Sequence, residues 1–443
     1  MKAHPILPAL CLVLGFNTMP ARAQTIDEMR LELKQLREEI DALKGRQAPQ
    51  VKSPADTGVS DRQMPVNSVA VTPPADAGVP DPRTAPKSVA TASPPRSAIP
   101  GGMLVPGTST SLYLYGYGET HAIHDFRQTS SPDVFTDLTY QPLNNAGGQT
   151  SKTQFTAETS RLGFRSSTPG PKGLFTTKVE VDFYSYGADN RNLLRLRHAY
   201  GEYDGWLIGQ TWSTFMDVDD LPETVDFNGP IGAPFSRRAQ VRYAFGDAKS
   251  GVRVTLAGED PADLAGGPSS GNKVPQLVAR LDKTFEWGAL NVRAMTHTKR
   301  SDTETRRGYG IGVGGSYKLG DKDLLMAQYA LVDGDVDALY GSNGYAIGKT
   351  SGAISFDRNQ GLVLGYAHVF SPALRSNVAL GLNRGQTVLG ASDRMLEEVF
   401  VNFIYSPIKN VDLGSEYIWG KRKTFAGQVG SLSRIDLMGR YSF

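Results

Sequence analysis

Over residues 111–443, apolar and polar residues alternate along segments of roughly 9–15 residues that are separated by turn residues. The clearest segment is "LFTTKVEVDFYSY", in which Val179 and Val181 fall on one face while Glu180 and Asp182 fall on the other. Side chains point alternately to the two faces of a β-strand. The pattern therefore predicts many strands, each with one apolar and one polar face.

The connections between these segments alternate in length. Short turns are expected at seven places, namely 168–171, 204–205, 246–249, 286–288, 320–321, 371–373 and 406–410. Eight other connections, most of them longer, are expected at 125–150, 187–190, 213–236, 260–273, 300–306, 333–357, 387–393 and 423–429. Together they imply sixteen strands, with short turns at one end and long loops at the other.

This arrangement is typical of barrels in the bacterial outer membrane. A sheet in lipid must close, because an open edge would leave backbone groups without hydrogen-bond partners. A soluble antiparallel sheet also alternates, but the strand number, strand length and loop pattern favour the membrane. We therefore expect an all-β, 16-stranded antiparallel outer-membrane β-barrel over residues 111–443.

The last segment, "RIDLMGRYSF", alternates up to the end of the chain. Ile435, Leu437 and Tyr441 are expected to face lipid, and Arg434 and Arg440 to face the interior. To close the barrel, this strand must pair with the first strand near "SLYLYGYGE".

Residues 1–23 have a different character. A short start with Lys2, an apolar run and the small residues Ala21 and Ala23 together describe a secretory signal peptide, with cleavage expected before Gln24. The pattern indicates an exported protein.

Residues 24–44 carry a heptad pattern that predicts a short α-helical coiled coil in the periplasm. Its expected core positions are Ile26, Met29, Leu33, Leu36, Ile40 and Leu43. Fewer than three heptads are marginal alone, so the segment is expected to support an oligomer that is held elsewhere. A single amphipathic helix is the alternative.

Residues 45–110 are predicted to be a disordered linker. Residues 45–100 contain eleven prolines, with Ala, Ser, Val and Asp between them. Such a composition does not bury a core and favours extended, solvated chain.

Composition narrows the function. The formal net charge is +2, and loss of Lys2 and Arg22 with the signal leaves zero and no cysteine. The mature chain therefore has no disulfide and no thiol nucleophile, and neutrality argues against nucleic acid as a partner.

Familiar catalytic motifs are missing, so we expect no enzyme and no cofactor. His121 and His124 offer a weak metal site, although a polar strand end is the favoured interpretation.

A barrel of sixteen strands is too wide for its side chains to fill, so an aqueous channel is expected, and inward residues set its selectivity. If the apolar face meets lipid, nine arginines face inward, namely Arg161, Arg165, Arg195, Arg197, Arg238, Arg242, Arg253, Arg280 and Arg293. Inward acids, such as Glu180 and Glu416, make the lumen mixed. We interpret the arginines as a basic ladder that guides anions; ordinary lumen polarity is the alternative.

The connection 213–236 is unusually acidic in its first half and apolar in its second. Its acids are Asp217, Asp219, Asp220, Glu223 and Asp226. A third external loop of this kind is expected to fold into the lumen as a constriction, with its acids facing the arginines and creating a transverse field. The alternative is a Ca²⁺ site at "DVDD", which lacks the EF-hand pattern; no metal is expected.

The barrel region resembles the DcaP-like family of trimeric outer-membrane porins. The resemblance is carried by "LYGYGE" (114–119), "TSRLGFRSSTP" (159–169), "LRLRHAYGEY" (194–203), "GQTWSTFMD" (209–217) and the ending "GRYSF". It implies a homotrimer with one pore in each protomer, a coiled coil that joins the chains, and uptake of small anions such as dicarboxylates. By the same resemblance, Arg161, Arg165, Arg195 and Arg197 would line the pore, and the loop from Ser213 would constrict it.

Two other functions remain open from the sequence. Phosphate-selective porins share the layout, although their pores usually contain lysine as well. An envelope tether is suggested by the coiled coil and the linker. In either case, Tyr441 and Phe443 resemble the signal that is read by the outer-membrane assembly machinery.

Overall fold

The computed structural model describes residues 99, 101–127, 134–144, 151–184, 193–247, 250–263, 272–387, 389 and 392–443. The predicted signal peptide, the predicted coiled coil and most of the predicted linker lie outside these residues. No helix in the described part has both the length and the apolar character that a bilayer crossing requires.

Sixteen strands form a closed antiparallel barrel, which confirms the predicted fold class. The first eight are β2 (Ser111–Asp125), β4 (Arg161–Gly170), β5 (Gly173–Asp182), β6 (Arg195–Tyr203), β7 (Trp206–Trp212), β8 (Arg237–Asp247), β9 (Val252–Glu259) and β10 (Gln276–Phe285). The second eight are β11 (Gly288–Arg300), β12 (Thr305–Leu319), β13 (Asp323–Asp333), β16 (Arg358–Ser371), β17 (Leu374–Gly385), β18 (Asp393–Ile408), β19 (Val411–Thr424) and β20 (Val429–Ser442).

Five short elements accompany the barrel strands. They are β1 (Met103–Leu104), β3 (Lys152–Thr156), the 3-10 helix η1 (Leu138–Tyr140), β14 (Tyr345–Ile347) and β15 (Ile354–Phe356). Strands β3 and β4 both pair with β2, so β3 continues the barrel wall beyond a break at 157–160. Strands β14 and β15 form a separate hairpin in the loop between β13 and β16.

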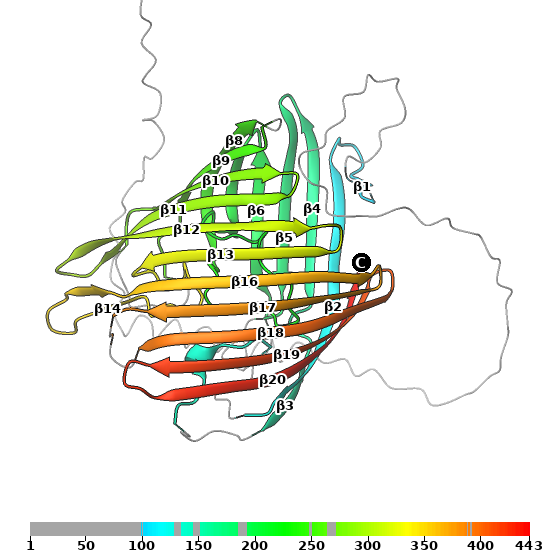
Figure 1. Cartoon of the computed structure of the whole chain (residues 1–443). Helices are drawn as coiled ribbons and strands as arrows, with labels where there is room; N and C mark the ends of the chain where they lie inside the picture. The colour runs from blue at the N-terminus through cyan, green and yellow to red at the C-terminus, as the bar shows by residue number, and fades with distance from the viewer. Residues whose placement is uncertain are drawn as a thin grey trace, which may run out of the picture. The chain divides into compact units, whose positions relative to one another are not determined.

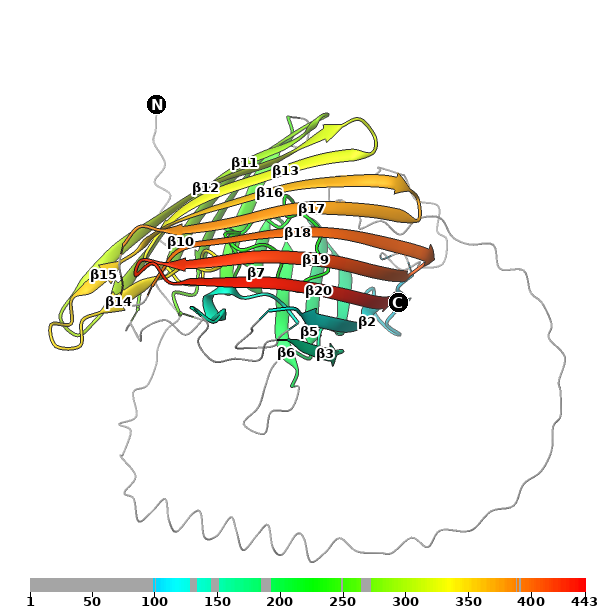
Figure 2. The ribbon, with the colours of Figure 1, turned by 60° about the horizontal axis from the view of Figure 1, so that its bottom comes forward.

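The last strand closes the barrel against the first. The register of β20 on β2 runs from Tyr117 opposite Ser442 to Asp125 opposite Arg434, and the two strands lie side by side in both views (Figures 1 and 2). The peptide N–H of Phe443 donates to the carbonyl of Gly116 at 3.0 Å. Phe443 therefore lies in the wall, as the alternation up to this residue predicted.

Turn chemistry fixes which end of the barrel has the short connections. The seven short turns lie where the sequence placed them, for example between β6 and β7 and between β18 and β19. Asp204 and Gly205 have φ of 50° and 84°, which is the left-handed pair that a two-residue hairpin turn needs. The other end of the barrel carries loop 3, which we define as residues 213–236, and the other long connections.

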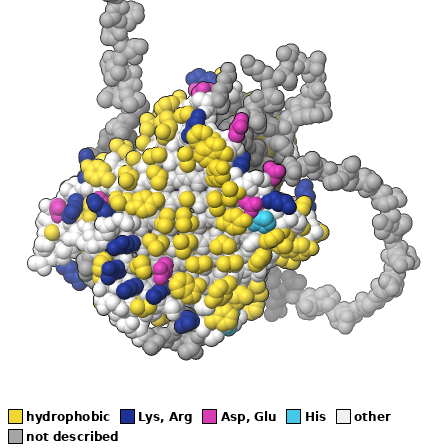
Figure 3. Space-filling view, in the orientation of Figure 1, with side chains coloured by type: hydrophobic (Ala, Val, Ile, Leu, Met, Phe, Trp, Pro, Cys, Tyr) yellow, Lys and Arg dark blue, Asp and Glu magenta, His cyan; other side chains and the backbone are white. Residues whose placement is uncertain are grey.

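The outward face is apolar, as expected. Leu162, Leu196, Val241 and Leu437 are among the exposed apolar side chains of the strands, and in Figure 3 such side chains cover most of the visible wall.

The inward face, however, is not uniformly polar. Several buried inward side chains of β11–β20 are apolar, namely Met295, Met326, Leu396, Phe400, Ile404, Ile418, Leu432 and Met438. All but Met326 pack in three clusters with residues of the loops, including Phe215, Val225 and Ile231 of loop 3. The inner surface of this half of the wall is therefore mixed, and loop 3 covers part of its apolar area.

Candidate functional site

Five cations from three neighbouring strands form one inward-facing group, which we call the cationic wall. Its members are Arg161 and Arg165 on β4, Lys178 on β5, and Arg195 and Arg197 on β6. The register between β5 and β6 shifts after Glu180, which is opposite His198, whereas Val181 is opposite Leu196. Arg197 is the extra residue of this bulge, and the bulge turns both Arg197 and His198 inward.

Two carboxylates lie between these cations. Asp182 accepts two hydrogen bonds from Arg195, at 3.0 and 2.7 Å, and one from Nη1 of Arg197 at 2.7 Å. Glu180 accepts from Nε of Arg197 at 3.0 Å and forms ion pairs with Lys178 at 3.1 Å and Arg161 at 3.4 Å. Five cations surround two carboxylates, so the cationic wall carries a formal charge of three positive units.

Arg165 differs from its neighbours because none of the ion pairs between described residues includes it. Its guanidinium lies over the ring of Tyr115, 5.0 Å from the centroid.

Aromatic rings support the other guanidinium groups in the same way. These contacts are Arg161 over Tyr117 at 5.0 Å, Arg195 over Tyr184 at 4.7 Å, and Arg197 over Trp212 at 5.8 Å and over Phe227 at 5.6 Å. A cation held over a ring face is fixed in orientation while its edge N–H groups stay available. The wall is thus a set of positioned donors rather than a group of mobile chains.

Loop 3 lies inside the barrel, because its partners are inward-facing residues of β9 to β19. Near its start, the N–H of Thr214 and the hydroxyl of Ser213 donate to Glu259 of β9, at 2.6 and 2.7 Å. Asp217 then forms an ion pair with Arg280 of β10 at 3.1 Å and accepts from Asn291 of β11 at 2.6 Å.

Further along, loop 3 crosses to the far wall. Glu223 forms a bidentate ion pair with Arg375 of β17, and both N···O distances are 2.8 Å. The N–H groups of Val225 and Asp226 donate to Glu416 of β19, at 3.0 and 2.8 Å.

Glycines allow the last part of loop 3 to press against β16 and β17. A Cβ at Gly381 would lie 2.5 Å from the carbonyl oxygen of Ile231, and a Cβ at Gly361 would collide with the carbonyl of Gly232. Gly232 itself has a φ of 85°, a conformation that favours glycine.

Loop 3 brings Asp217 to two of the predicted pore arginines, Arg280 and Arg293, rather than to the cationic wall. Asp217 and Glu223 are engaged with Arg280 and Arg375 on the wall behind the loop. Instead, loop 3 presents Phe227 to the cationic wall, with the guanidinium of Arg195 5.5 Å from its ring. The physical reason is that a loop buried in the lumen must satisfy its polar groups on the nearest wall.

The remaining acids of loop 3 have different surroundings. Asp219 is exposed, whereas Asp220 is buried and accepts from Asn291 at 3.1 Å. Asp226 accepts from the N–H groups of Thr136, Asn228 and Gly229. Burial raises the pKa of Asp226 to about 6, although Arg434 and these N–H groups oppose the rise.

The structure also separates the nine predicted pore arginines. Arg238 and Arg293 have side-chain exposures of 1% and 0%, so neither lines an open channel. Arg293 donates to the carbonyls of Phe215 and Val313, and Arg280 fastens Asp217. These three arginines hold loops in place, and alternation alone could not tell them from the cationic wall.

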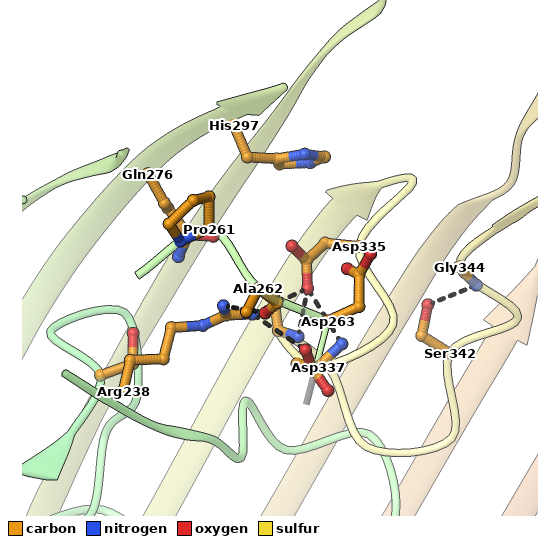
Figure 4. Close-up of polar contacts among 12 residues, drawn as sticks. Arg238, Pro261, Ala262, Asp263, Gln276, His297, Asp335, Asp337, Ser342 and Gly344 are labelled. Atoms are coloured by element: carbon orange, nitrogen blue, oxygen red, sulfur yellow. Dashed lines mark hydrogen bonds and ion pairs between the residues drawn. The ribbon is translucent and has the colours of Figure 1, made fainter. Parts of the chain in front are cut away.

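Arg238 is the centre of a second polar cluster, near the loop end of the barrel (Figure 4). Its Nη1 donates to the carbonyls of Asp260 and Ala262, each at 2.7 Å, and its Nη2 pairs with Asp337 at 3.1 Å. Asp335, which also contacts Lys299, completes the group. Burial alone would raise the pKa of Asp335, but the positive charges of Lys299 and Arg238 outweigh burial, so the pKa lies below its ordinary value. The cluster ties two external loops to β8 and β11.

Arg242 and Arg253 lie nearer the turn end. Arg242 is 3.8 Å from Glu202 of β6. Arg253 is exposed and stands opposite Asp282 in the register of β9 and β10.

The two histidines near the first strand's end do not form a site. His121 faces inward and contacts Asp436 at 3.0 Å and Glu119 at 3.2 Å, whereas His124 contacts Thr153. Within the described residues, no group of three or more His, Cys, Asp or Glu side chains is arranged to hold a metal ion.

Sequence reasoning missed the residues that shape the cationic wall. Lys178 shares the polar face of β5 with Glu180 and Asp182, so the period of two could have added it to the arginines. Tyr115 and Tyr117 share the face of Glu119 on β2, and this period of two could have found them. Phe227 gave no such signal, because its position depends on the path of loop 3.

A closed barrel of sixteen strands, with short turns at one end and a loop folded inside, is the architecture of an outer-membrane porin. The model of the DcaP outer membrane protein family matches residues 104–443. The chain therefore belongs to that family.

Solved structures agree with this assignment. The outer membrane channel DcaP of Acinetobacter baumannii shares 30% identity with a TM-score of 0.70, covering 77% of this chain and 99% of that chain. Two more distant structures share the fold. One is an anion-selective porin from Comamonas acidovorans, with 11% identity and a TM-score of 0.52, covering 75% of this chain and 100% of that chain. The other is a trimer form of OmpT from Vibrio cholerae, with 14% identity and a TM-score of 0.50, covering 75% of this chain and 99% of that chain. A comparison with curated proteins finds no match.

Proposed function

We propose that the chain forms a passive, anion-preferring channel in the bacterial outer membrane. The observation that carries this proposal is the excess of cations on the cationic wall, where four basic side chains share Glu180 and Asp182 while Arg165 pairs with neither. In a pore with low-dielectric walls, uncompensated charge of one sign raises the local concentration of the opposite ion. Anions are thereby drawn toward the wall and cations are repelled.

The preferred solutes of this proposal are small organic anions such as dicarboxylates. The planar fork of arginine matches a carboxylate, and Arg161 and Arg165 present such forks at fixed positions over aromatic rings. Two carboxylates on one solute would engage two of these groups at once. Loop 3 acts as the constriction, with Phe227 opposite the arginines.

Planar-bilayer reversal potentials under a salt gradient test the anion preference. We expect the potential to have the sign of an anion-selective pore, and cation selectivity would contradict the proposal. Swelling of proteoliposomes in succinate, compared with phosphate at matched osmolarity, separates a dicarboxylate channel from a phosphate-selective one. Faster swelling in succinate is the expected result.

The proposed assembly is a homotrimer with its N-terminal segment in the periplasm. A solved structural relative has a trimer form, and the heptads of residues 24–44 offer a helical contact between chains. Deleting residues 24–44 should lower the temperature at which the trimer dissociates on a native gel without abolishing it. A monomer at all temperatures would show that the barrel does not hold the trimer.

The terminal residues Tyr441 and Phe443 serve in this proposal as the signal for the outer-membrane assembly machinery. Both are exposed on the outer face. Replacing Phe443 with Ala should lower the amount of folded protein at the cell surface more than it lowers the conductance of the channels that do insert. Normal surface levels would contradict the assignment.

A further inference from the structure

A group of basic side chains lies on the outer face of the barrel, outside the pore. It consists of Arg384 on β17, Arg394 on β18, and Lys421 and Lys423 on β19; we call it the outer cation cluster. In the sheet register, Met395 stands opposite both Arg384 and Lys423, so the strands that carry these residues are direct neighbours. Figure 3 shows Lys and Arg side chains gathered on the outer face at the loop ends of these strands.

Alternation places these residues on the lipid side. Lys421 and Lys423 fall on the same face of β19 as Tyr417 and Trp419, which are exposed outward-facing rings. Arg384 has the period of the exposed Val378. Arg394 is exposed at the register shift near the start of β18.

The cluster is not neutralised within the chain. None of the ion pairs between described residues involves any of its four members. By contrast, Arg358 of β16, on the same rim, forms an ion pair with Asp333 at 2.7 Å. The acid among these side chains is Glu397, which stands opposite Lys421 in the register but makes no ion pair with it. Four cations and one acid leave three positive charges on this patch.

The depth of the cluster in the membrane follows from β19. Lys421 is two residues beyond Trp419, which is about 7 Å along a strand. Aromatic girdles mark the boundary of the apolar band of a barrel, so the cations stand just outside the hydrocarbon on the loop side. That side faces the external leaflet, whose lipid in this kind of membrane is a phosphorylated glycolipid.

We propose that the outer cation cluster binds the phosphate groups of a glycolipid molecule in the external leaflet. Lysine and arginine side chains at this depth extend along apolar surface and place their charges at the headgroup level. Arginine forks and lysine ammonium groups are the usual donors for phosphate. The acyl chains of the same lipid would lie on the apolar outer face of β17–β19 below, next to Val401 and Trp419.

The test uses the full mature chain in detergent and purified lipid A as the probe. Lys421→Gln with Lys423→Gln should weaken binding by about tenfold, since each basic residue near an anionic lipid surface contributes a few-fold in affinity. The matched control is Lys318→Gln with Lys409→Gln, which removes the same charge from exposed positions at the turn end. That control should bind lipid A as the parent does.

Three further outcomes decide the proposal. Dephosphorylated lipid A should bind the parent about as weakly as phosphorylated lipid A binds the double variant, and inorganic phosphate should not compete. Equal binding of lipid A by the double variant, or competition by free phosphate, would overturn the lipid assignment. Unchanged single-channel conductance of the double variant shows that the barrel is folded, so a loss of lipid binding is then specific to the cluster.

Discussion

The two halves of the barrel use arginine in opposite ways. On β4–β6, five cations surround two carboxylates and are held over aromatic rings, so charge remains for a solute. On β10–β17, Arg280, Arg293 and Arg375 are engaged by loop 3. The same residue type therefore serves recognition on one side and attachment of a loop on the other. The difference lies in how many acceptors reach each arginine.

The inner surfaces of the two halves explain this difference. The inward residues of β18–β20 include Phe400, Ile418 and Leu432, which are buried, so loop 3 packs there to remove them from water. A loop that packs on a wall brings backbone carbonyls and carboxylates with it. The cationic wall lacks such an apolar neighbour, and loop 3 reaches it mainly through Phe227.

The largest expected effect is on the side that holds loop 3. Arg293→Met should lower the free energy of unfolding by about 3 kcal/mol, because it removes the donor to the buried carbonyl of Phe215 and the cation beside the buried Asp217. Denaturant titration of the folded protein in lipid vesicles measures this. Arg253→Met, at an exposed position, is the control and should change stability little. Equal stability of both variants would show that Arg293 does not fasten the loop.

On the cationic wall, the expected effect is on selectivity. Arg195→Ala with Arg197→Ala lowers the formal charge of the wall from three to one, and the anion-to-cation permeability ratio should fall by about five- to tenfold. Reversal potentials measure the ratio. Lys421→Gln with Lys423→Gln removes the same charge from the outer face and should leave the ratio unchanged. A ratio that stays constant in the arginine variant would refute the role of the wall.

The opposite change on the same wall should sharpen the preference. Asp182→Asn raises the formal charge by one while its side-chain oxygen still accepts a hydrogen bond from Arg195 or Arg197. The permeability ratio should rise by about two- to threefold. Asp282→Asn, on β10 beside Arg280, serves as the control on the other half and should shift the ratio less. A fall in the ratio for Asp182→Asn would contradict the charge argument.

The smallest effect is expected at Glu223. Its pair with Arg375 is partly exposed, with side-chain exposures of 40% and 31%, and such pairs contribute about 0.2–1 kcal/mol. Glu223→Gln should therefore change the free energy of unfolding by less than 1 kcal/mol, as measured by the same titration. A loss as large as that of Arg293→Met would mean that loop 3 depends on this outer pair.

The barrel itself could be predicted from the sequence, because each of its signals is local. A period of two assigns faces, turn residues such as Asp204 and Gly205 end strands, and the terminal strand up to Phe443 implies closure. These rules gave the strand number, the turn positions and the inward placement of Arg161, Arg165, Arg195 and Arg197. They depend on neighbouring residues along one chain segment, which the sequence displays directly.

Which arginines are available to a solute was decided only by the tertiary structure. Arg165 and Arg293 have the same alternation in their strands, yet one lies over a ring without a carboxylate and the other is buried beneath loop 3. Whether each arginine stays accessible depends on where loop 3, from a distant part of the chain, packs. The position of loop 3 follows from apolar burial and from the need to pair buried polar groups. The sequence determined which residues face inward; the path of loop 3 determined which of them remain open.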